Sequence, residues 1–345
     1  MQPKKRSLPW KATIVTLLTL CFFYGLARYS FSTNRITARA ETVYELDPLE
    51  TDSAWLSDTE FLTTRGLERE QPHFYTRHKL DGSVLESLAP AVLKDAAQDR
   101  YLRRALSPDG KWLIYQTFDG IATCRSDGSE CKLIKEKHLN SYYSRLIWQA
   151  DSASWLELIY DGRATYHCTV VKRETGTNRK LSKFIFDPIS STDYNYPEFC
   201  DLSGNLVGFE SKSQGGTGFH LLCCIQSISA NNPVVKSIQF PSQIVSEVEC
   251  TLSPAGDEVA VSVLGKDPPQ LMDKIWHFFS RKPLAPKKYA ALYVCHLDGS
   301  GMRELGREYV GPNEPLFANV QWTPSGKYLS WIWNAKIWRL SVNQN

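Results

Sequence analysis

Cysteine and histidine are the residues of this 345-residue chain that most readily bind metals or act as nucleophiles. The sequence contains nine cysteines and seven histidines, but it has no C-x-x-C pair, and no histidine stands at a metal-ligand spacing from a cysteine. Zinc sites are built from such closely spaced pairs. We therefore expect no metal site.

The sequence also lacks the motifs that place a catalytic nucleophile or a phosphate group. G-x-S-x-G, H-E-x-x-H, G-x-x-x-x-G-K-[ST] and G-x-G-x-x-G do not occur. Aspartates such as Asp109 and Asp127 stand in turn signals instead, where a carboxylate usually stabilises the turn. We expect no catalytic residue and no cofactor.

One turn signal recurs along the chain and marks the elements that would position any site. LSPDGK begins at Leu106, LSPAGD at Leu252 and WTPSGK at Trp322, and looser copies begin at Trp148 and Cys200. In each copy an apolar stretch enters a turn rich in Pro, Asp, Gly or Ser, and a second apolar stretch follows. Each copy is predicted to be a β-hairpin.

A second turn signal, DGS, follows a third apolar stretch at residues 81–83, 127–129 and 298–300. Asp-Gly between alternating strands is a strong hairpin signal. Each unit of about 40 to 60 residues therefore predicts four antiparallel strands, which is one blade of a β-propeller.

The segment LSPDGKWLIYQTFDGIATCRSDGSECKLI resembles the repeat of TolB-type β-propellers, and the similarity extends over residues 106–134, 252–305 and 322–342. The resemblance implies a six-bladed propeller outside the cytoplasmic membrane of a bacterium. It carries over no catalytic residue.

The number of units agrees with six blades. Five begin near residues 101, 143, 196, 246 and 316, and residues 50–92 form the sixth. We expect ETVYELD at residues 41–47 to add the fourth strand of the last blade and so close the ring. The predicted fold is all-β, a six-bladed propeller of four-stranded antiparallel blades over residues 41–345, with a short helix at residues 89–99.

The N-terminal segment predicts a membrane anchor. Residues 1–11 are basic and expected in the cytoplasm, residues 12–28 form an apolar transmembrane helix, and residues 29–40 form a linker. A cleaved signal peptide is the alternative. Both interpretations predict export, and with the anchor the protein spans the bacterial inner membrane once and holds the propeller in the periplasm.

Export allows disulfide bonds. Cys124 and Cys131 flank a DGS turn symmetrically and would face each other across a hairpin, so they are the candidate pair. Cys168, Cys223 and Cys295 fall, like Cys124, in third strands of different blades. Blades stack about 10 Å apart, too far for disulfides between them, and we expect buried apolar cysteines there.

One insertion, at residues 266–288, interrupts the fifth blade. Apolar residues at helical spacing form a stripe there, namely Leu271, Met272, Ile275, Phe278 and Phe279. The stripe either packs on the propeller itself or docks onto a partner protein or the membrane surface. The candidate docking residues are Leu271, Ile275, Trp276, Phe278 and Phe279, with a basic run beside them.

Two functions follow from these features. The favoured one is a protein-binding scaffold or sensor module without catalysis, which engages another envelope or membrane protein while the N-terminal helix inserts into the membrane. The segment before that helix is too short to bind nucleic acid. The alternative is a lyase or hydrolase with a site in the central funnel that acts on a glycan or small molecule, since one fold hosts many functions.

Overall fold

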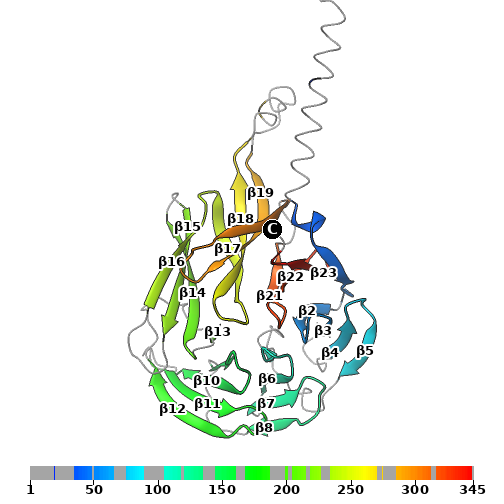
Figure 1. Ribbon diagram of the computed structural model, residues 1–345, viewed down its shortest axis with the longest axis vertical. Helices are drawn as coiled ribbons and strands as arrows, with labels where there is room; N and C mark the ends of the chain where they lie inside the picture. Colours follow the sequence, from blue (N-terminus) through cyan, green and yellow to red (C-terminus); the bar gives the residue numbers. More distant parts are fainter. Residues whose placement is uncertain are drawn as a thin grey trace, which may run out of the picture.

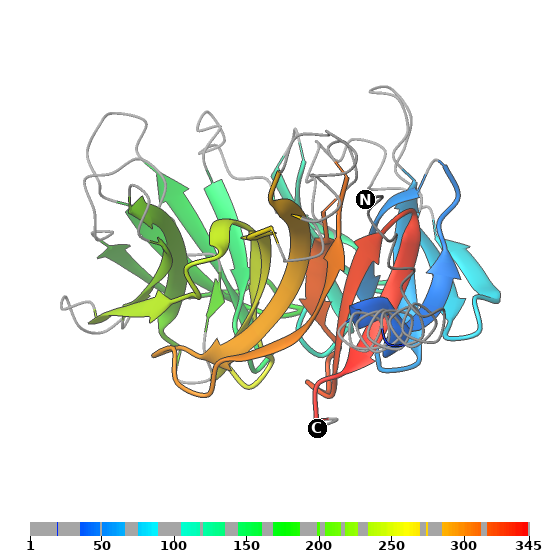
Figure 2. The ribbon, with the colours of Figure 1, turned by 90° about the horizontal axis from the view of Figure 1, so that it is seen from above.

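The computed structural model of this protein describes residues 35–48, 50–65, 75–88, 105–117, 120–134, 144–160, 168–186, 199–200, 204–214, 218–226, 234–269, 285–311 and 316–343, together with Thr19 and Lys274. The described chain forms a ring of six antiparallel sheets (Figure 1). Seen at right angles to that view, the ring is a flat disc (Figure 2). The predicted six-bladed, all-β propeller is confirmed.

Four blades consist of four consecutive strands. They are β2 (Glu50–Trp55), β3 (Glu60–Arg65), β4 (Tyr75–Lys79) and β5 (Val84–Leu88); β9 (Ser144–Trp148), β10 (Ser154–Tyr160), β11 (Cys168–Glu174) and β12 (Lys180–Phe186); β13 (Phe199–Cys200), β14 (Leu206–Gln214), β15 (Gly218–Gln226) and β16 (Val234–Gln239); and β17 (Ile244–Leu252), β18 (Glu258–Asp267), β19 (Lys287–His296) and β20 (Arg303–Tyr309).

The remaining two blades depart from this scheme. One contains β6 (Trp112–Thr117), β7 (Gly120–Arg125) and β8 (Lys132–Ile134), and a single bridge from Leu106 to Leu113 takes the place of its inner strand. Residues 101–104, which begin the predicted inner strand, lie outside the described residues, so four full strands stay a prediction for this blade. The other blade combines β21 (Ala318–Trp322), β22 (Tyr328–Trp333) and β23 (Lys336–Ser341) with β1 (Glu41–Glu45).

Pairing of β1 with β23 closes the ring, as predicted for residues 41–47. The register joins Glu41 to Arg339 and Glu45 to Lys336. Before β1, the short 3-10 helix η1 (Ile36–Ala38) packs on the neighbouring blade, where Ile36 is fully buried and lies against Gly306 of β20. The start of the described chain thus links two blades.

The repeated turns lie where the sequence places them, between first and second strands and between third and fourth strands. In the first kind, the Ser107 hydroxyl accepts the backbone N–H of Trp112 at 2.9 Å and donates to Asp109 at 2.6 Å. Gly110 has φ of +71°, and a Cβ there would lie 2.2 Å from the carbonyl oxygen of Leu56. The turn is therefore both locally capped and pressed against the preceding blade.

Two sequence predictions concern segments outside the described residues. The short helix at residues 89–99 is one, and the transmembrane helix at residues 12–28, of which only Thr19 is described, is the other. Within the described part of the chain, no helix has the length and apolar character required to cross a membrane.

A buried polar cluster holds the blade of β2–β5 against the closing strand. Thr63 donates to the Glu50 carboxylate and lies 2.9 Å from Nε2 of His78, whose ring centroid is 4.5 Å from that of Tyr44 in β1. Burial by itself would raise the pKa of Glu50, but hydrogen bonds from His78, Thr63 and nearby groups outweigh it and lower the pKa to about 2.

The depressed pKa of Glu50 predicts that Glu50→Gln destabilises the ring in a pH-dependent way. A carboxylate with a folded-state pKa of about 2 and an ordinary value of 4.5 stabilises the fold above pH 4.5 and loses this effect as the pH falls toward 2. At pH 7 we expect a loss of about 3 kcal/mol in the free energy of unfolding, shrinking as the pH is lowered from 5 to 3.

Urea unfolding at several pH values measures this loss. Glu45→Gln is the control, because the Glu45 side chain is 75% exposed and its ion pair with Lys336 spans 3.7 Å. A loss for Glu50→Gln that is the same at pH 7 and pH 3 would assign the effect to shape rather than charge.

Arg339 is a charged side chain that holds the closing strand in the ring. Its side chain is 7% exposed and pairs with Glu41 of β1. Its guanidinium also donates to the carbonyl of Asp58 in the next blade and lies 4.2 Å from the ring centroid of Tyr328. One side chain thus connects the closing strand, its own blade and the neighbouring blade.

Arg339→Ala is therefore expected to lower the free energy of unfolding of the whole ring by about 2 kcal/mol, since it removes the charged hydrogen bonds to the closing strand and the next blade together with the packing of the guanidinium on Tyr328. Arg125→Ala is the matched control: Arg125 also pairs with a glutamate and lies 4.9 Å from the Trp112 ring, but its side chain is 41% exposed. Equal effects of the two changes in thermal unfolding would contradict this role of Arg339.

Candidate binding cavity on the ring axis

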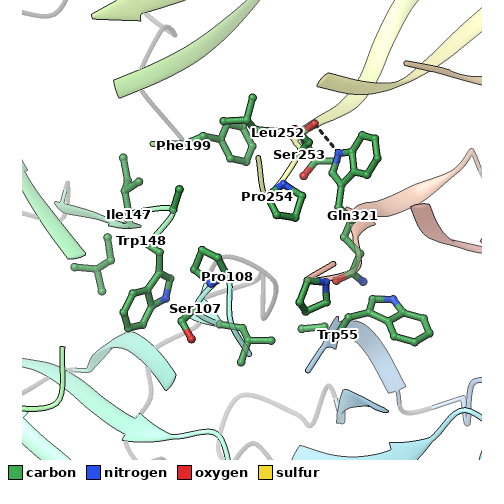
Figure 3. A pocket seen from close by; sticks show the side chains of 17 residues that line it. Trp55, Ser107, Pro108, Ile147, Trp148, Phe199, Leu252, Ser253, Pro254 and Gln321 are labelled. Atoms are coloured by element: carbon green, nitrogen blue, oxygen red, sulfur yellow. Dashed lines mark hydrogen bonds between the residues drawn. The ribbon is translucent and has the colours of Figure 1, made fainter. Parts of the chain in front are cut away.

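A cavity of about 160 Å³ lies where the inner strands of the blades end. Residues from all six blades line it (Figure 3). They are Ala54, Trp55, Leu106, Ser107, Pro108, Leu146, Ile147, Trp148, Ala150, Phe199, Thr251, Leu252, Ser253, Pro254, Gln321, Trp322 and Pro324. The repeated Ser-Pro and Thr-Pro turns therefore surround the cavity as well as reversing the chain.

The lining is more apolar than polar, and it includes three tryptophans. The indole N–H of Trp148 donates to the carbonyl of Ala105 at 2.9 Å, and that of Trp55 donates to the Ser330 hydroxyl at 2.7 Å. Trp322 donates to the carbonyl of Thr251 at 3.4 Å. Because these N–H groups are bonded within the protein, the rings offer apolar atoms to whatever enters the cavity.

Gln321 is a fixed polar group in the lining. Its Nε2 donates to the carbonyl of Ser53 at 3.0 Å, and the adjacent Asn319 donates to the same carbonyl at 2.9 Å. These bonds cross the seam between the last blade and the blade of β2–β5, and they orient the Gln321 amide. With its nitrogen bonded in this way, the amide offers a ligand its oxygen, a hydrogen-bond acceptor.

The cavity's size and composition define what it can hold. None of the lining residues that the structure describes carries an ionisable side chain. A volume near 160 Å³ is close to that of an apolar cavity that accepts one benzene ring, about 150 Å³. The cavity is thus suited to one aromatic or branched apolar group, and it is small for an oligosaccharide.

The predicted cysteine pair lies away from the cavity. The structure joins Cys124 to Cys131 by a disulfide across the turn from β7 to β8, with the Cα atoms 4.1 Å apart. Cys223, Cys250 and Cys295 are buried in the apolar core between blades. Burial, with a smaller effect of nearby acidic residues, raises the pKa of the Cys295 thiol to about 12, so this thiol stays protonated near neutral pH.

The five predicted docking residues, Leu271, Ile275, Trp276, Phe278 and Phe279, lie outside the described residues and stay a prediction. The boundaries of the insertion need a correction. β18 continues to Asp267 and β19 begins at Lys287, because Asp267 pairs with Lys287 and Lys266 with Lys288. The insertion within residues 266–288 is therefore carried on a two-stranded extension that projects beyond the ring (Figure 1).

Residues that could hold a metal do not gather in the described part of the chain, where no group of three or more His, Cys, Asp or Glu side chains has suitable geometry. The turn aspartates are held by their own turns. The side chain and backbone N–H of Ser129 donate to Asp127 and lower the pKa of its carboxyl, and Ser300 does the same for Asp298.

Sequence reasoning placed a possible site in the central funnel and identified the turns that surround it, but it did not assign the residues that line the cavity. The signal was the position that the turns share. Each Ser-Pro or Thr-Pro pair follows the end of an inner strand, and the ends of the inner strands meet at the axis of a propeller. Trp55 had no signal of this kind, because its turn lacks the motif, and Phe199 precedes only the loose copy at Cys200, which contains no proline.

Comparison with known proteins gives similarity of fold only. Neither protein-family models nor curated proteins match the sequence. Similar solved structures include TolB from Acinetobacter baumannii, with 13% identity, 83% of this chain and 64% of that chain covered, and a TM-score of 0.45. Oligogalacturonate lyase from Vibrio parahaemolyticus has 8% identity, coverage of 90% and 93%, and a TM-score of 0.45.

A second oligogalacturonate lyase structure, in complex with manganese, has 10% identity, coverage of 89% and 90%, and a TM-score of 0.48. The similar structures thus include both TolB and a lyase. Function has to be argued from the residues of this chain.

We expect Cys124 and Cys131 to be joined by a disulfide in the cell, and mass spectrometry can test this. Protein isolated from cells with thiols blocked at lysis should yield a peptide with Cys124 and Cys131 linked, and Cys295 should be alkylated only after unfolding, because its thiol is buried and protonated. Alkylated Cys124 and Cys131 in the untreated protein would show that the pair is reduced and would weigh against export.

Proposed function

We propose that this protein is a non-catalytic binding module, a scaffold or sensor, whose axial cavity holds an apolar side chain of a partner protein. The observation that carries the proposal is the cavity lining: six blades converge on one small, mainly apolar space, to which the described residues contribute fixed indole rings, one oriented amide and no ionisable group. Such a lining favours burial of an apolar anchor residue, the usual centre of a protein interface.

The proposal includes the membrane anchor at residues 12–28 and places the propeller on the periplasmic side of a bacterial inner membrane. Support comes from the apolar N-terminal segment with basic residues before it, and from the disulfide, which is typical of exported proteins. A partner consistent with this location is another envelope or membrane protein.

A lyase or hydrolase in the funnel is the second candidate, and the cavity supports it less. Glycan cleavage requires groups that transfer protons at the reacting bond. The lining residues in the described part of the chain supply hydroxyl and amide groups in their place. Binding is therefore the function that this cavity supports best.

Filling the cavity tests the proposal. Ala150 lines the cavity, whereas Ala153 lies in the same turn with its side chain exposed to solvent. In crosslinking pulldowns of the tagged full-length protein from native membranes, Ala150→Trp should lose the partner that the unchanged protein captures, and Ala153→Trp should retain it. We expect a loss of at least about tenfold, because an interface anchor contributes about 2 kcal/mol or more.

The comparison is interpretable only if both variants fold, which their thermal unfolding checks. Capture of the same partner by Ala150→Trp and Ala153→Trp would contradict binding in the cavity. Release of a glycan product by the unchanged protein, abolished by Ala150→Trp, would favour the enzyme.

A further inference from the structure

The projecting part of β18 and β19 carries a pair of like charges. Lys266 and Lys288 stand directly opposite each other across the two strands, and both are exposed. Like charges at directly opposed positions destabilise a sheet. The pairing lowers stability unless an anion occupies the space beside the two ammonium groups.

The start of the described chain lies on the same face of this sheet. Side chains two residues apart in a strand share a face, so Lys288 shares one with Ala290, and Ala290 is paired with Glu308. The Glu308 carboxylate accepts the backbone N–H of Thr37 at 3.1 Å and lies 3.9 Å from Nε of Arg35.

Arg35 is held at this position by the backbone as well. It forms a parallel bridge with Arg307 of β20, and its side chain is 58% exposed. On the opposite face of the sheet, Arg307 pairs with Asp267 at 3.1 Å, and that aspartate is also paired across the strands with Lys287. The described acidic groups beside these strands, Glu308 and Asp267, are therefore engaged, and the exposed side chains described on the face of Lys266 and Lys288 are basic.

We propose that this basic edge, formed by Arg35, Lys266 and Lys288, rests on anionic lipid headgroups and holds the propeller at a fixed orientation to the membrane. The inference depends on the proposed anchor at residues 12–28. Only residues 29–34 separate that segment from Arg35. Even fully extended, they reach about 20 Å.

The short connection decides which part of the ring meets the membrane. The anchor would leave the rim beside β20, on the side where β18 and β19 project beyond the ring (Figure 1). The cavity lies instead on the ring axis, among the turns at the other end of β17 and β18. With the basic edge against the lipid, the cavity remains open to a partner.

Lysine reactivity measures this contact directly. The full-length chain is placed in nanodiscs of phosphatidylcholine with phosphatidylglycerol, in nanodiscs of phosphatidylcholine alone, and in detergent, and is treated with a water-soluble amine reagent. We expect Lys266 and Lys288 to react about threefold less in the anionic nanodiscs than in the other two, because only an anionic surface attracts them.

Lys111 and Lys327 are the matched controls, since both are exposed in turns near the cavity. Their reactivity should be the same in all three environments. The protection of Lys266 and Lys288 should also weaken at high salt, which screens charge over shorter distances.

The outcomes separate the two proposals. Unprotected Lys266 and Lys288 in a chain that migrates with anionic nanodiscs would overturn the lipid contact and leave the anchor intact. Equal protection with and without phosphatidylglycerol would overturn the role of charge. A chain that fails to migrate with nanodiscs would overturn the anchor, and the lipid contact with it.

Discussion

Closure of the ring is the constraint on which the rest of this structure depends. A propeller blade buries its two faces against its two neighbours, so one open seam exposes the faces of two blades at once. Here β1 joins the last blade as its outer strand, and Arg339 secures it by reaching both Glu41 and the carbonyl of Asp58. Residues 41 and 339 are far apart in the sequence, so closure requires nearly the whole chain to be folded.

The seam between the last blade and the blade of β2–β5 also determines the shape of the cavity. Trp55 and Gln321 line the cavity from the two blades that the seam joins, and the bonds that fix them cross it. The Trp55 indole donates to Ser330, and the Gln321 amide donates to the carbonyl of Ser53. A change that loosens the seam would therefore alter the cavity, and a partner of the proposed kind that filled it would stabilise the closed ring.

The fold could be predicted from the sequence because short turn motifs, which depend only on neighbouring residues, mark its hairpins. Turn chemistry at Ser107 and Asp127 depends on neighbours within five residues, and it repeats from blade to blade. The closing strand was predicted by counting strands. A site in the central funnel was considered from the sequence. The residues that line it were not predicted, because they depend on how six strand ends converge, and the distances between those ends are set by the packing of side chains between blades. In the blade of β6–β8 the described residues keep one bridge of the predicted inner strand, from Leu106 to Leu113.

Residues 35–45 combine three tasks that are usually divided among separate segments. Ile36 is buried against Gly306 of one blade, and β1 completes the next blade five residues later. In the proposed arrangement the same segment continues from the membrane anchor. Force on the anchor would then act first on Ile36 and the Arg35–Glu308 contact, before it reaches β1. This order protects the closing strand, because η1 must leave its site on β20 before the β1–β23 pairing bears any load.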